Sequence, residues 1–308
     1  MILYAVDGNY ILHKVWFTIA NKNKIAKKHL GKIVATRMLD FICSDYNKLG
    51  ATHLCVAFDG GENFRYNVYK LYKANRNPDG DKYTARERGT DGLSTKEVYN
   101  YLEQTIALLQ SAGIPVVQLP KYEADDVLAS LAQLPTNVIL GCRDKDQFQN
   151  LKPNVRMWFS ERSVGHFITE KDAVEKLGVR IDQMIDFQTL LGDGGDNVPK
   201  IPLKAKLGAK TVAKYLQTHG TISKFFKNGT PEERRILTAH QQQLRINREL
   251  VTLRKDVYKP KPSELKIKKV DPKPGWPESY SSLVIDDKLF KSTKKGSLKG
   301  IMKRRGSW

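Results

Sequence analysis

Nine acidic residues stand at or just after the ends of short apolar segments, and this pattern constrains the fold more than any other feature of the chain. They are Asp7, Asp59, Glu123, Asp125, Asp126, Asp144, Asp146, Asp193 and Asp196. The rest of the chain is basic, with 52 Lys and Arg against 33 Asp and Glu and a net charge of +19. Converging carboxylates repel one another unless divalent cations lie between them. The sequence therefore predicts a metal site on a positive protein, a combination typical of phosphate-ester chemistry on nucleic acid.

Short apolar segments alternate with helical patterns through the first two-thirds of the chain. The predicted strands are Ile2–Val6, His53–Phe58, Pro115–Leu119 and Asn137–Leu140. Helices are predicted over Gly31–Leu49, from the capping box that begins at Ser94, and from near Glu123. This alternation predicts an α/β fold with a mostly parallel central sheet flanked by helices, whose ligands gather at the carboxyl ends of the strands. Asp7, Asp59 and Asp144 occupy that edge.

Strand patterns fade after Thr169, and three helices are predicted over Ile181–Leu191, Gly208–Thr218 and His240–Leu253. Beyond Val257 the sequence is rich in Pro and Lys, which is typical of a linker. The last 21 residues carry eight Lys or Arg and no acid, and either bind a partner or merely aid solubility. We therefore predict an α/β domain over 1–190, a helical subdomain over 191–257, and a linker with a basic tail over 258–308.

Composition excludes several kinds of site. No apolar segment approaches the length that spans a bilayer, and no signal-peptide pattern precedes the first predicted strand. The three cysteines, Cys43, Cys55 and Cys142, form no C-x-x-C pair, which argues against a zinc site and favours small core residues in a reducing compartment. We expect no membrane partner and a cytoplasmic location, which is the host cytoplasm if the chain is viral.

Each acidic segment is ambiguous when taken alone. Glu123-Ala124-Asp125-Asp126 can present ligands from a helix N-terminus, but acids stabilise such a terminus without any metal. Asp144-Lys145-Asp146 follows a buried strand, and Gly192-Asp193-Gly194-Gly195-Asp196-Asn197 also suits an ordinary turn. Their joint occurrence in this order is what indicates a site for Mg²⁺, which prefers carboxylate oxygens, water and phosphate.

In this order the segments resemble the flap endonuclease / 5′-3′ exonuclease family, in its compact bacteriophage or bacterial form without an attached polymerase. The resemblance runs from Val6-Asp7-Gly8 to about Leu216. It implies a PIN-like nuclease fold with a helical arch at about 62–92 and a helix-three-turn-helix DNA-binding subdomain. It also implies that the nine acids hold two or more Mg²⁺ ions, for which Mn²⁺ substitutes. Asp7, Asp59, Glu123, Asp125 and Asp144 or Asp146 would lie nearest the first ion, and Asp193 and Asp196 would complete the second.

The segment from Phe64-Arg65 to Asn75-Arg76 resembles the arch of the family, through which a single-stranded 5′ end passes. The resemblance makes Lys73 and Arg76 catalytic residues and places Arg65 and Tyr72 among the DNA contacts. Lys73 and Arg76 fall about one turn apart on one predicted helix face, beside tyrosines that can stack on bases. The alternative is a solvated basic helix whose tyrosines pack on the core.

Lys206-Leu207-Gly208-Ala209-Lys210-Thr211 resembles the part of the helix-three-turn-helix that grips duplex backbone. The resemblance implies DNA contacts from Lys204, Lys206, Gly208, Lys210 and Thr211, aided by the N-terminus of the following helix. Lys206 replaces the first glycine of the usual G-x-G hairpin, which argues against the K⁺ site often found there. A nearby clamp-like peptide, His219 to Phe226, is more simply read as core positions of a helix.

The resemblance implies a structure-specific 5′ nuclease that hydrolyses DNA, and RNA primers, near 5′ ends and single-strand/duplex junctions by a two-metal mechanism. Its partners would be DNA with 5′ flaps, nicks or free 5′ ends, and RNA–DNA hybrids. We expect a monomer, and the basic tail is a candidate contact for other replication proteins. Two alternatives stay open: a PIN-type ribonuclease, which needs fewer acids and lacks the helical hairpin domain, and a non-catalytic DNA-binding protein, which leaves the nine carboxylates unexplained.

Overall fold

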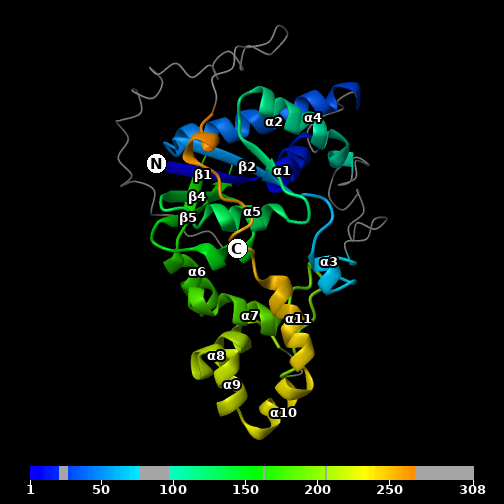
Figure 1. The fold of residues 1–308 in the computed structure, drawn as a ribbon, viewed down its shortest axis with the longest axis vertical. Coiled ribbons are helices and arrows are strands. Elements are labelled where there is room, and N and C mark those ends of the chain that lie inside the picture. The colour runs from blue at the N-terminus through cyan, green and yellow to red at the C-terminus, as the bar shows by residue number, and fades with distance from the viewer. Residues whose placement is uncertain (21–26, 76–96, 162–163, 205–206, 268–308) are drawn as a thin grey trace.

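One six-stranded sheet organises the upper half of the molecule (Figure 1). The computed structural model describes residues 1–20, 27–75, 97–161, 164–204 and 207–267. The strand order is β3-β2-β1-β4-β5-β6, and only the last pairing is antiparallel. The strands are β1 (Ile2–Asp7), β2 (His53–Phe58), β3 (Val116–Gln118), β4 (Asn137–Gly141), β5 (Val155–Glu161) and β6 (Val164–Ile168). The four predicted strands and the mostly parallel sheet are confirmed, whereas β5 and β6 were not predicted.

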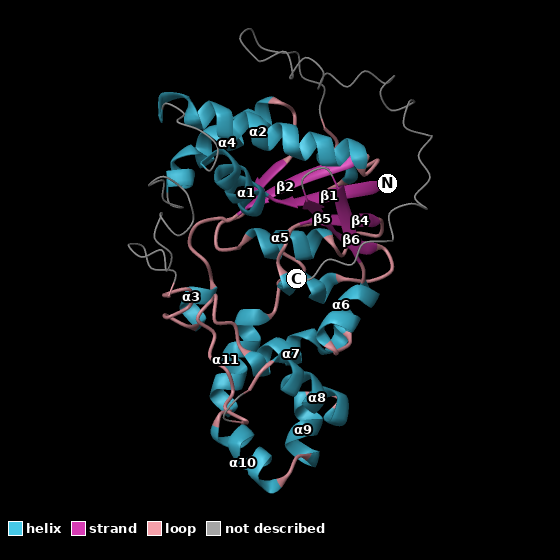
Figure 2. Cartoon of the chain, turned by 180° about the vertical axis from the view of Figure 1, so that it is seen from behind, coloured by secondary structure: helices cyan, strands magenta, loops and turns pink. Residues whose placement is uncertain are grey.

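Helices cover both faces of the sheet (Figure 2). On one face lie α1 (Gly8–Ala20), α2 (Lys27–Lys48), the 3₁₀ helix η1 (Glu97–Tyr101) and α4 (Leu102–Ser111). Strand residues Tyr4, Val56 and Ile139 pack there against Leu12 and Leu39. Because side chains alternate along a strand, each buried strand supplies apolar residues to both faces. The prediction of a helix over Gly31–Leu49 is confirmed by α2.

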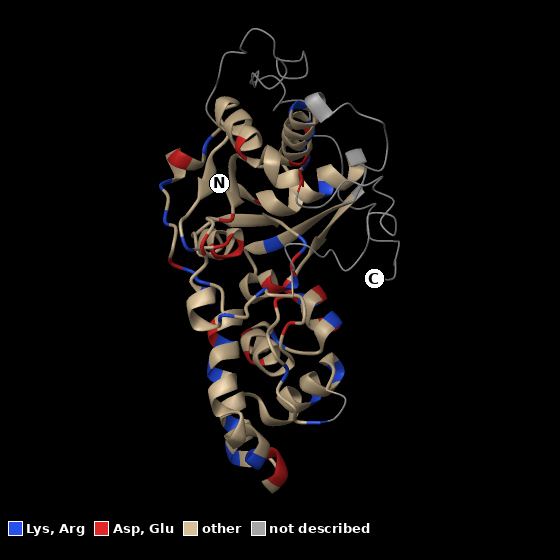
Figure 3. Cartoon of the chain, turned by 90° about the vertical axis from the view of Figure 1, so that its right-hand side faces the viewer, with Lys and Arg blue, Asp and Glu red and all other residues tan. Residues whose placement is uncertain are grey.

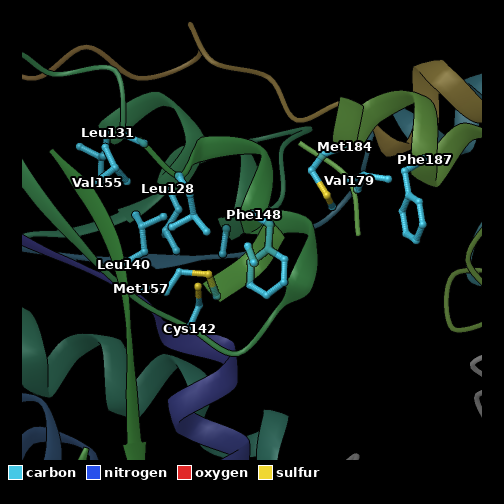
Figure 4. Packing of buried hydrophobic residues seen from close by; sticks show 14 of the residues in the cluster. Leu128, Leu131, Leu140, Cys142, Phe148, Val155, Met157, Val179, Met184 and Phe187 are labelled. Carbon is cyan, nitrogen blue, oxygen red and sulfur yellow. The ribbon is translucent and has the colours of Figure 1, made fainter. Parts of the chain in front are cut away.

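The other face packs against α5 (Ala124–Leu131) and the 3₁₀ helix η2 (Lys145–Asn150). Figure 4 shows Leu128 and Leu131 of α5 close to Leu140 and Met157 of the sheet, with Phe148 beside them. The same cluster continues to Met184 and Phe187 of the helical part. This continuous core joins the sheet to the helices below it, so the edge of the sheet and the helical part are held in one arrangement.

The lower half of the molecule is helical (Figure 1). It contains α6 (Glu170–Leu177), η3 (Ile181–Gln183), α7 (Met184–Leu191), α8 (Ala209–His219), α9 (Ile222–Asn228), α10 (Pro231–Ala239) and α11 (Gln241–Val251). Ile222 and Phe225 are buried in the core, which confirms their interpretation as core positions. Helix α11 runs back toward the sheet and contacts α3 (Arg65–Val68). Among the described residues, no helix is long and apolar enough to cross a membrane.

Two predicted segments differ from the structure. The arch was expected as a helical segment, but α3 has only four residues and the chain then turns repeatedly as far as Asn75. Residues 76–96, including Arg76, lie outside the described residues. The linker was expected from Val257 onward, yet Leu265 of η4 (Pro262–Leu265) is fully buried and η4 packs on β2. Residues 258–267 therefore belong to the folded body, and the predicted basic tail lies outside the described residues.

Candidate metal centre at the carboxyl edge of the sheet

Eight of the nine predicted acids line one pocket of about 180 Å³. They are Asp7, Asp59, Glu123, Asp125, Asp144, Asp146, Asp193 and Asp196. Their positions span almost 190 residues of sequence, so the fold and not local sequence brings them together. The pocket lies where the carboxyl ends of the parallel strands meet the helical part, as expected for an α/β sheet. Their role as metal ligands stays a prediction.

The strand ends place the first acids. Asp7 is the last residue of β1, and its carboxylate accepts a hydrogen bond from the Tyr10 N–H at 3.0 Å. Gly8 follows because a Cβ there would lie 2.6 Å from the Phe58 ring. Asp59 follows β2 and accepts the Ala124 N–H at 2.8 Å. This bond ties Asp59 to the first residue of α5, whose unpaired N–H groups favour a negative charge.

The start of helix α5 points the side chains of three neighbouring acids in different directions. Glu123 is its N-cap, and Asp125 points toward the pocket, where its carboxylate accepts a hydrogen bond from Gln147 at 2.9 Å. Asp126 is fully buried, does not line the pocket, and is bound by both terminal nitrogens of Arg65. The prediction that Asp126 binds metal is therefore wrong in this structure, because both of its carboxylate oxygens accept hydrogen bonds from groups inside the protein.

The remaining acids come from turns after β4 and α7. The Asp144 carboxylate accepts the Asp146 N–H at 2.8 Å, and Asp146 in turn accepts a short hydrogen bond from Gln188 of α7. Gly192 ends α7 with φ +67°, and a Cβ there would meet the Val198 carbonyl at 2.4 Å. The turn that follows is closed by two backbone hydrogen bonds between Asp193 and Val198. It projects the Asp193 and Asp196 side chains into the pocket.

Burial and mutual repulsion change the acidity of the cluster. Burial, reinforced by Asp59 and Asp144, raises the pKa of Asp7 to about 7. Burial and the nearby acids likewise raise the pKa of Asp125, Asp144 and Asp146. Burial acts in the same direction on Glu123, but Lys73 and Arg65 hold its pKa below the usual value. Cations therefore outweigh burial and repulsion at Glu123, and Lys145 lies 3.4 Å from the Asp193 carboxylate, whereas burial and repulsion prevail at Asp7, Asp125, Asp144 and Asp146.

The donor set fits divalent cations that prefer oxygen. Carboxylates dominate the pocket, and cations placed among them would relieve the repulsion that raises their pKa values. Within the described part of the chain, no group of three or more Asp, Glu, His or Cys side chains is arranged to hold an ion by itself. Mg²⁺ does not require such a cage, because it keeps several waters and binds one or two carboxylates plus phosphate.

Lys73 lies in the pocket as an internal counter-charge. Its ammonium group pairs with Glu123 through a short contact and lies 3.9 Å from Asp196. The Tyr72 hydroxyl is 3.1 Å from Glu123 and 2.9 Å from Asp196. Lys73 has φ +56° and stands in a turn, so the prediction of a helix at Lys73 is wrong, while Arg76 lies outside the described residues.

Two predicted DNA contacts are buried. Arg65 is 1% exposed, and its guanidinium is occupied by Asp126. Tyr72 is 3% exposed and packs with Val198, Leu250 and Val251. Both side chains form part of the pocket wall, but exposures this small leave neither of them a surface for a DNA strand to contact. Arg65 and Lys73 both line the pocket, and Lys73 is the more accessible of the two, with 16% of its side chain exposed.

The predicted duplex-binding loop leads into α8. Gly208 is the N-cap of α8, and a Cβ there would meet no atom within 4 Å. Lys204 and Lys210 are exposed, and Thr211 is partly exposed, while Leu203 and Leu207 anchor the loop in the core. Lys206 lies outside the described residues. Figure 3 shows basic segments spread along the helical part and acidic ones gathered where it meets the sheet.

Sequence reasoning missed part of the pocket wall. Asn9, Tyr10 and His13 come from α1, and Tyr99 comes from η1. The His13 ring nitrogen Nε2 and the Tyr99 hydroxyl are 2.9 Å apart. The first three follow Asp7 closely and could have been found by extending a helix from β1. Tyr99 carries no such signal, because only the tertiary fold brings it next to α1.

Comparisons with known proteins agree with the architecture. A family model described as the 5′-3′ exonuclease N-terminal resolvase-like domain matches residues 2–178, and one described as the 5′-3′ exonuclease C-terminal SAM fold matches residues 179–273. The bacteriophage T5 D15 flap endonuclease, solved as a complex with DNA and metal ions, is 23% identical with a TM-score of 0.66. This alignment covers 82% of this chain and 90% of that chain, and it shows a shared fold.

Sequence relatives extend the comparison. The 5′-3′ exonuclease of Buchnera aphidicola is 29% identical over 233 residues, which are 73% of each protein. The DNA polymerase I of Rhizobium leguminosarum is 31% identical over 217 residues, or 67% of this chain. The aligned region spans only 19% to 28% of the DNA polymerase I relatives. Because the first family model alone covers more than half of the chain, the resemblance inferred from the motifs is confirmed, and the protein belongs to the 5′-3′ exonuclease family.

Proposed function

We propose that this protein is a metal-dependent, structure-specific 5′ nuclease that hydrolyses DNA phosphodiesters near 5′ ends and single-strand/duplex junctions. The observation that carries the proposal is the convergence of eight carboxylates and Lys73 on one pocket. The match of both family models supports the same activity. The substrates would be 5′ flaps, nicks and free 5′ ends, together with RNA–DNA hybrids at primers.

The cations would be two or more Mg²⁺ ions, for which Mn²⁺ can substitute. When bound, such ions lower the pKa of a water and stabilise charge on the phosphate during in-line displacement. The first group of ligands would be Asp7, Asp59, Glu123, Asp125 and Asp144 or Asp146. The second would be Asp193 and Asp196, whose turn enters the pocket from the helical part.

Lys73 would contribute electrostatically. Its ammonium group already lies among carboxylates, at the place where a negatively charged phosphate would enter. With cations bound to the acids, the same ammonium is available to contact a phosphate oxygen, where a fixed positive charge stabilises developing negative charge. Arg76 is proposed for a neighbouring phosphate on the strength of the family resemblance.

The helical part would bind the duplex. Gly208 allows close approach of a phosphate to the N-terminus of α8, and Lys204, Lys206, Lys210 and Thr211 would contact neighbouring phosphates. Contacts of this kind position the backbone and carry no sequence information, so specificity would be for DNA structure. This assignment follows the division into an α/β domain over 1–190 and a helical subdomain over 191–257.

The decisive assay compares substrates and metal conditions. A 5′-flapped duplex, a nicked duplex and a matched single-stranded RNA are incubated with Mg²⁺ or with EDTA, using wild type, Asp144→Asn and Asp182→Asn. Asp182 is a suitable control because it is an exposed surface acid paired with Arg180. We expect Mg²⁺-dependent cleavage near the flap junction that is lost on EDTA addition. The cleavage rate should be at least a hundredfold lower in Asp144→Asn and unchanged in Asp182→Asn.

Other outcomes would separate the alternatives. Cleavage of RNA alone would favour a PIN-type ribonuclease, and tight DNA binding without cleavage in any metal would favour a non-catalytic binding protein. Equal activity of Asp144→Asn and wild type would contradict the proposed use of the pocket.

A further inference from the structure

A buried charged pair lies at the wall of the pocket, where Arg65 forms part of the lining and Asp126 lies behind it. Arg65 is 1% exposed and Asp126 is fully buried. Two parallel hydrogen bonds of 2.7 and 2.8 Å join the guanidinium to the carboxylate. This bidentate geometry is the strongest form of an ion pair between side chains. The pair joins α3, at the start of the segment that carries Lys73, to the third residue of α5.

The remaining hydrogen-bonding groups of the pair tie it to a third segment. Arg65 Nε donates to the Leu250 carbonyl at 2.9 Å, and Asp126 accepts the Arg254 N–H at 2.9 Å. Both of these partners lie at or just beyond the end of α11. Asp126 also accepts the N–H of Glu123 at 3.3 Å, which closes the capping box of α5. The pair is therefore the junction of three segments far apart in sequence.

The same guanidinium acts on the pocket directly. Arg65 Nη1 lies 3.3 Å from the carboxylate of Glu123, which faces the pocket. Asp125, between Glu123 and Asp126, faces the pocket as well. The direction in which α5 presents these two acids thus depends on where Arg65 and Asp126 hold its first turn.

A buried ion pair is a poor source of net stability. Taking both charges out of water offsets much of their attraction, and an apolar pair of similar volume often stabilises a protein equally well. Exact orientation is what a bidentate pair provides and an apolar pair does not. The placement of this pair next to two pocket acids points to orientation as its task.

We propose that Arg65 and Asp126 form a positioning pair that aligns Glu123 and Asp125 for metal and anchors the Lys73 segment, and that neither residue binds metal or DNA itself. This inference rests on the proposed nuclease function. It reassigns two residues for which the sequence suggested other roles.

A double-mutant cycle tests the proposal. The variants are Arg65→Met, Asp126→Leu and the double variant. Arg65→Lys is a conservative variant that keeps the positive charge but cannot form the two parallel hydrogen bonds. Three quantities are measured: Mn²⁺ binding without DNA, kcat on a 5′-flapped duplex at saturating Mg²⁺, and the unfolding midpoint. Asp186→Asn serves as the control, because Asp186 is also a buried acid paired with an arginine, the half-exposed Arg248, but does not line the pocket.

The proposal predicts that the two single variants lose kcat and Mn²⁺ affinity to a similar degree. Each single variant should lower kcat at least tenfold and weaken Mn²⁺ binding several-fold with unchanged stoichiometry. The kcat of the double variant should be no lower than that of the less active single variant, because the two residues act as one unit. Arg65→Lys should recover only part of kcat. Asp186→Asn should lower the unfolding midpoint while kcat of the folded protein stays at the wild-type level.

Several results would overturn it. Fewer Mn²⁺ ions bound by Asp126→Leu but not by Arg65→Met would make Asp126 a ligand. Multiplicative losses in the double variant would show independent roles, and wild-type kcat in both single variants would show a purely structural pair. The Mn²⁺ titration needs no nuclease substrate, so it decides the question of alignment even if the wild-type protein does not cleave DNA.

Discussion

Single residues show how one acidic motif divides into different tasks. Asp125 and Asp126 are neighbours in sequence, yet successive residues of a helix point about 100° apart. One carboxylate therefore faces the pocket, whereas the other faces the protein interior and meets Arg65. Counting acids in a motif overestimates the number of metal ligands wherever a buried arginine lies behind the helix.

The cysteines give a prediction at this scale. Burial raises the pKa of Cys43 and Cys55 to about 12, and burial with nearby acids raises the pKa of the Cys142 thiol. Since the thiolate is the reactive form, we expect a disulfide reagent at pH 8 to modify less than one thiol per folded chain within minutes. In concentrated guanidinium all three should react. Rapid modification of the folded protein would show that one of these sites opens easily.

At the scale of elements, the segment that ends at Asn75 is tied to the turn after α7. The Lys73 N–H donates to the Asp196 carbonyl at 2.9 Å, and Asn197 donates from its side chain to the Leu71 carbonyl at 2.7 Å. Asn75 donates to the Gly194 carbonyl. These bonds hold the segment that carries Lys73 and the turn that carries Asp193 and Asp196 together at the pocket.

Asn197 allows this tie to be tested. It has φ +58°, a conformation that Asn tolerates better than Ala. Asn197→Ala loses both the hydrogen bond and this tolerance and should lower the free energy of unfolding by about 2 kcal/mol. Asn197→Gly loses only the bond and should lower it by about 1 kcal/mol. Urea unfolding measures both values, and equal losses would mean that backbone strain at this position is negligible.

At the scale of the whole molecule, the charge is divided in space. The chain carries a net +19, while the acids that line the pocket are concentrated at the edge of the sheet. Under the proposed function, the positive surface would attract the DNA backbone, and the acidic pocket would accept it only together with cations. DNA binding and metal binding would then fall on different parts of a single fold.

The salt dependence of DNA binding tests this division. Each lysine that contacts a phosphate should contribute about one unit to the slope of log affinity against log salt concentration. Lys204→Ala and Lys210→Ala should each lower that slope by about one, measured with flapped DNA in Ca²⁺ by fluorescence anisotropy. Lys171→Ala, an exposed lysine of α6, should leave the slope unchanged. An unchanged slope in all three variants would remove α8 from the DNA-binding surface.

The local sequence pattern was sufficient to predict a strand where both faces of that strand are packed against other parts of the protein. Strands such as His53–Phe58 are continuous apolar runs, and they were predicted at almost the observed bounds. The β5–β6 hairpin was missed because Arg156, Ser160 and His166 interrupt its apolar residues. Cation–ring contacts, such as Arg156 over Phe167, stabilise that hairpin and leave no periodic signal. The predicted domain division and the roles of the site residues stay predictions.

The sequence by itself determined the kind of fold, the family and which acids follow a strand or stand in a turn, because strand ends and turn residues are local properties. Only the tertiary structure decided that Asp126 is shielded from the pocket and that the ammonium group of Lys73 lies inside it. Asp126 meets Arg65 across 61 positions, and Lys73 meets Glu123 across 50. Such pairings depend on how the chain closes in space, and the composition of either segment does not reveal them.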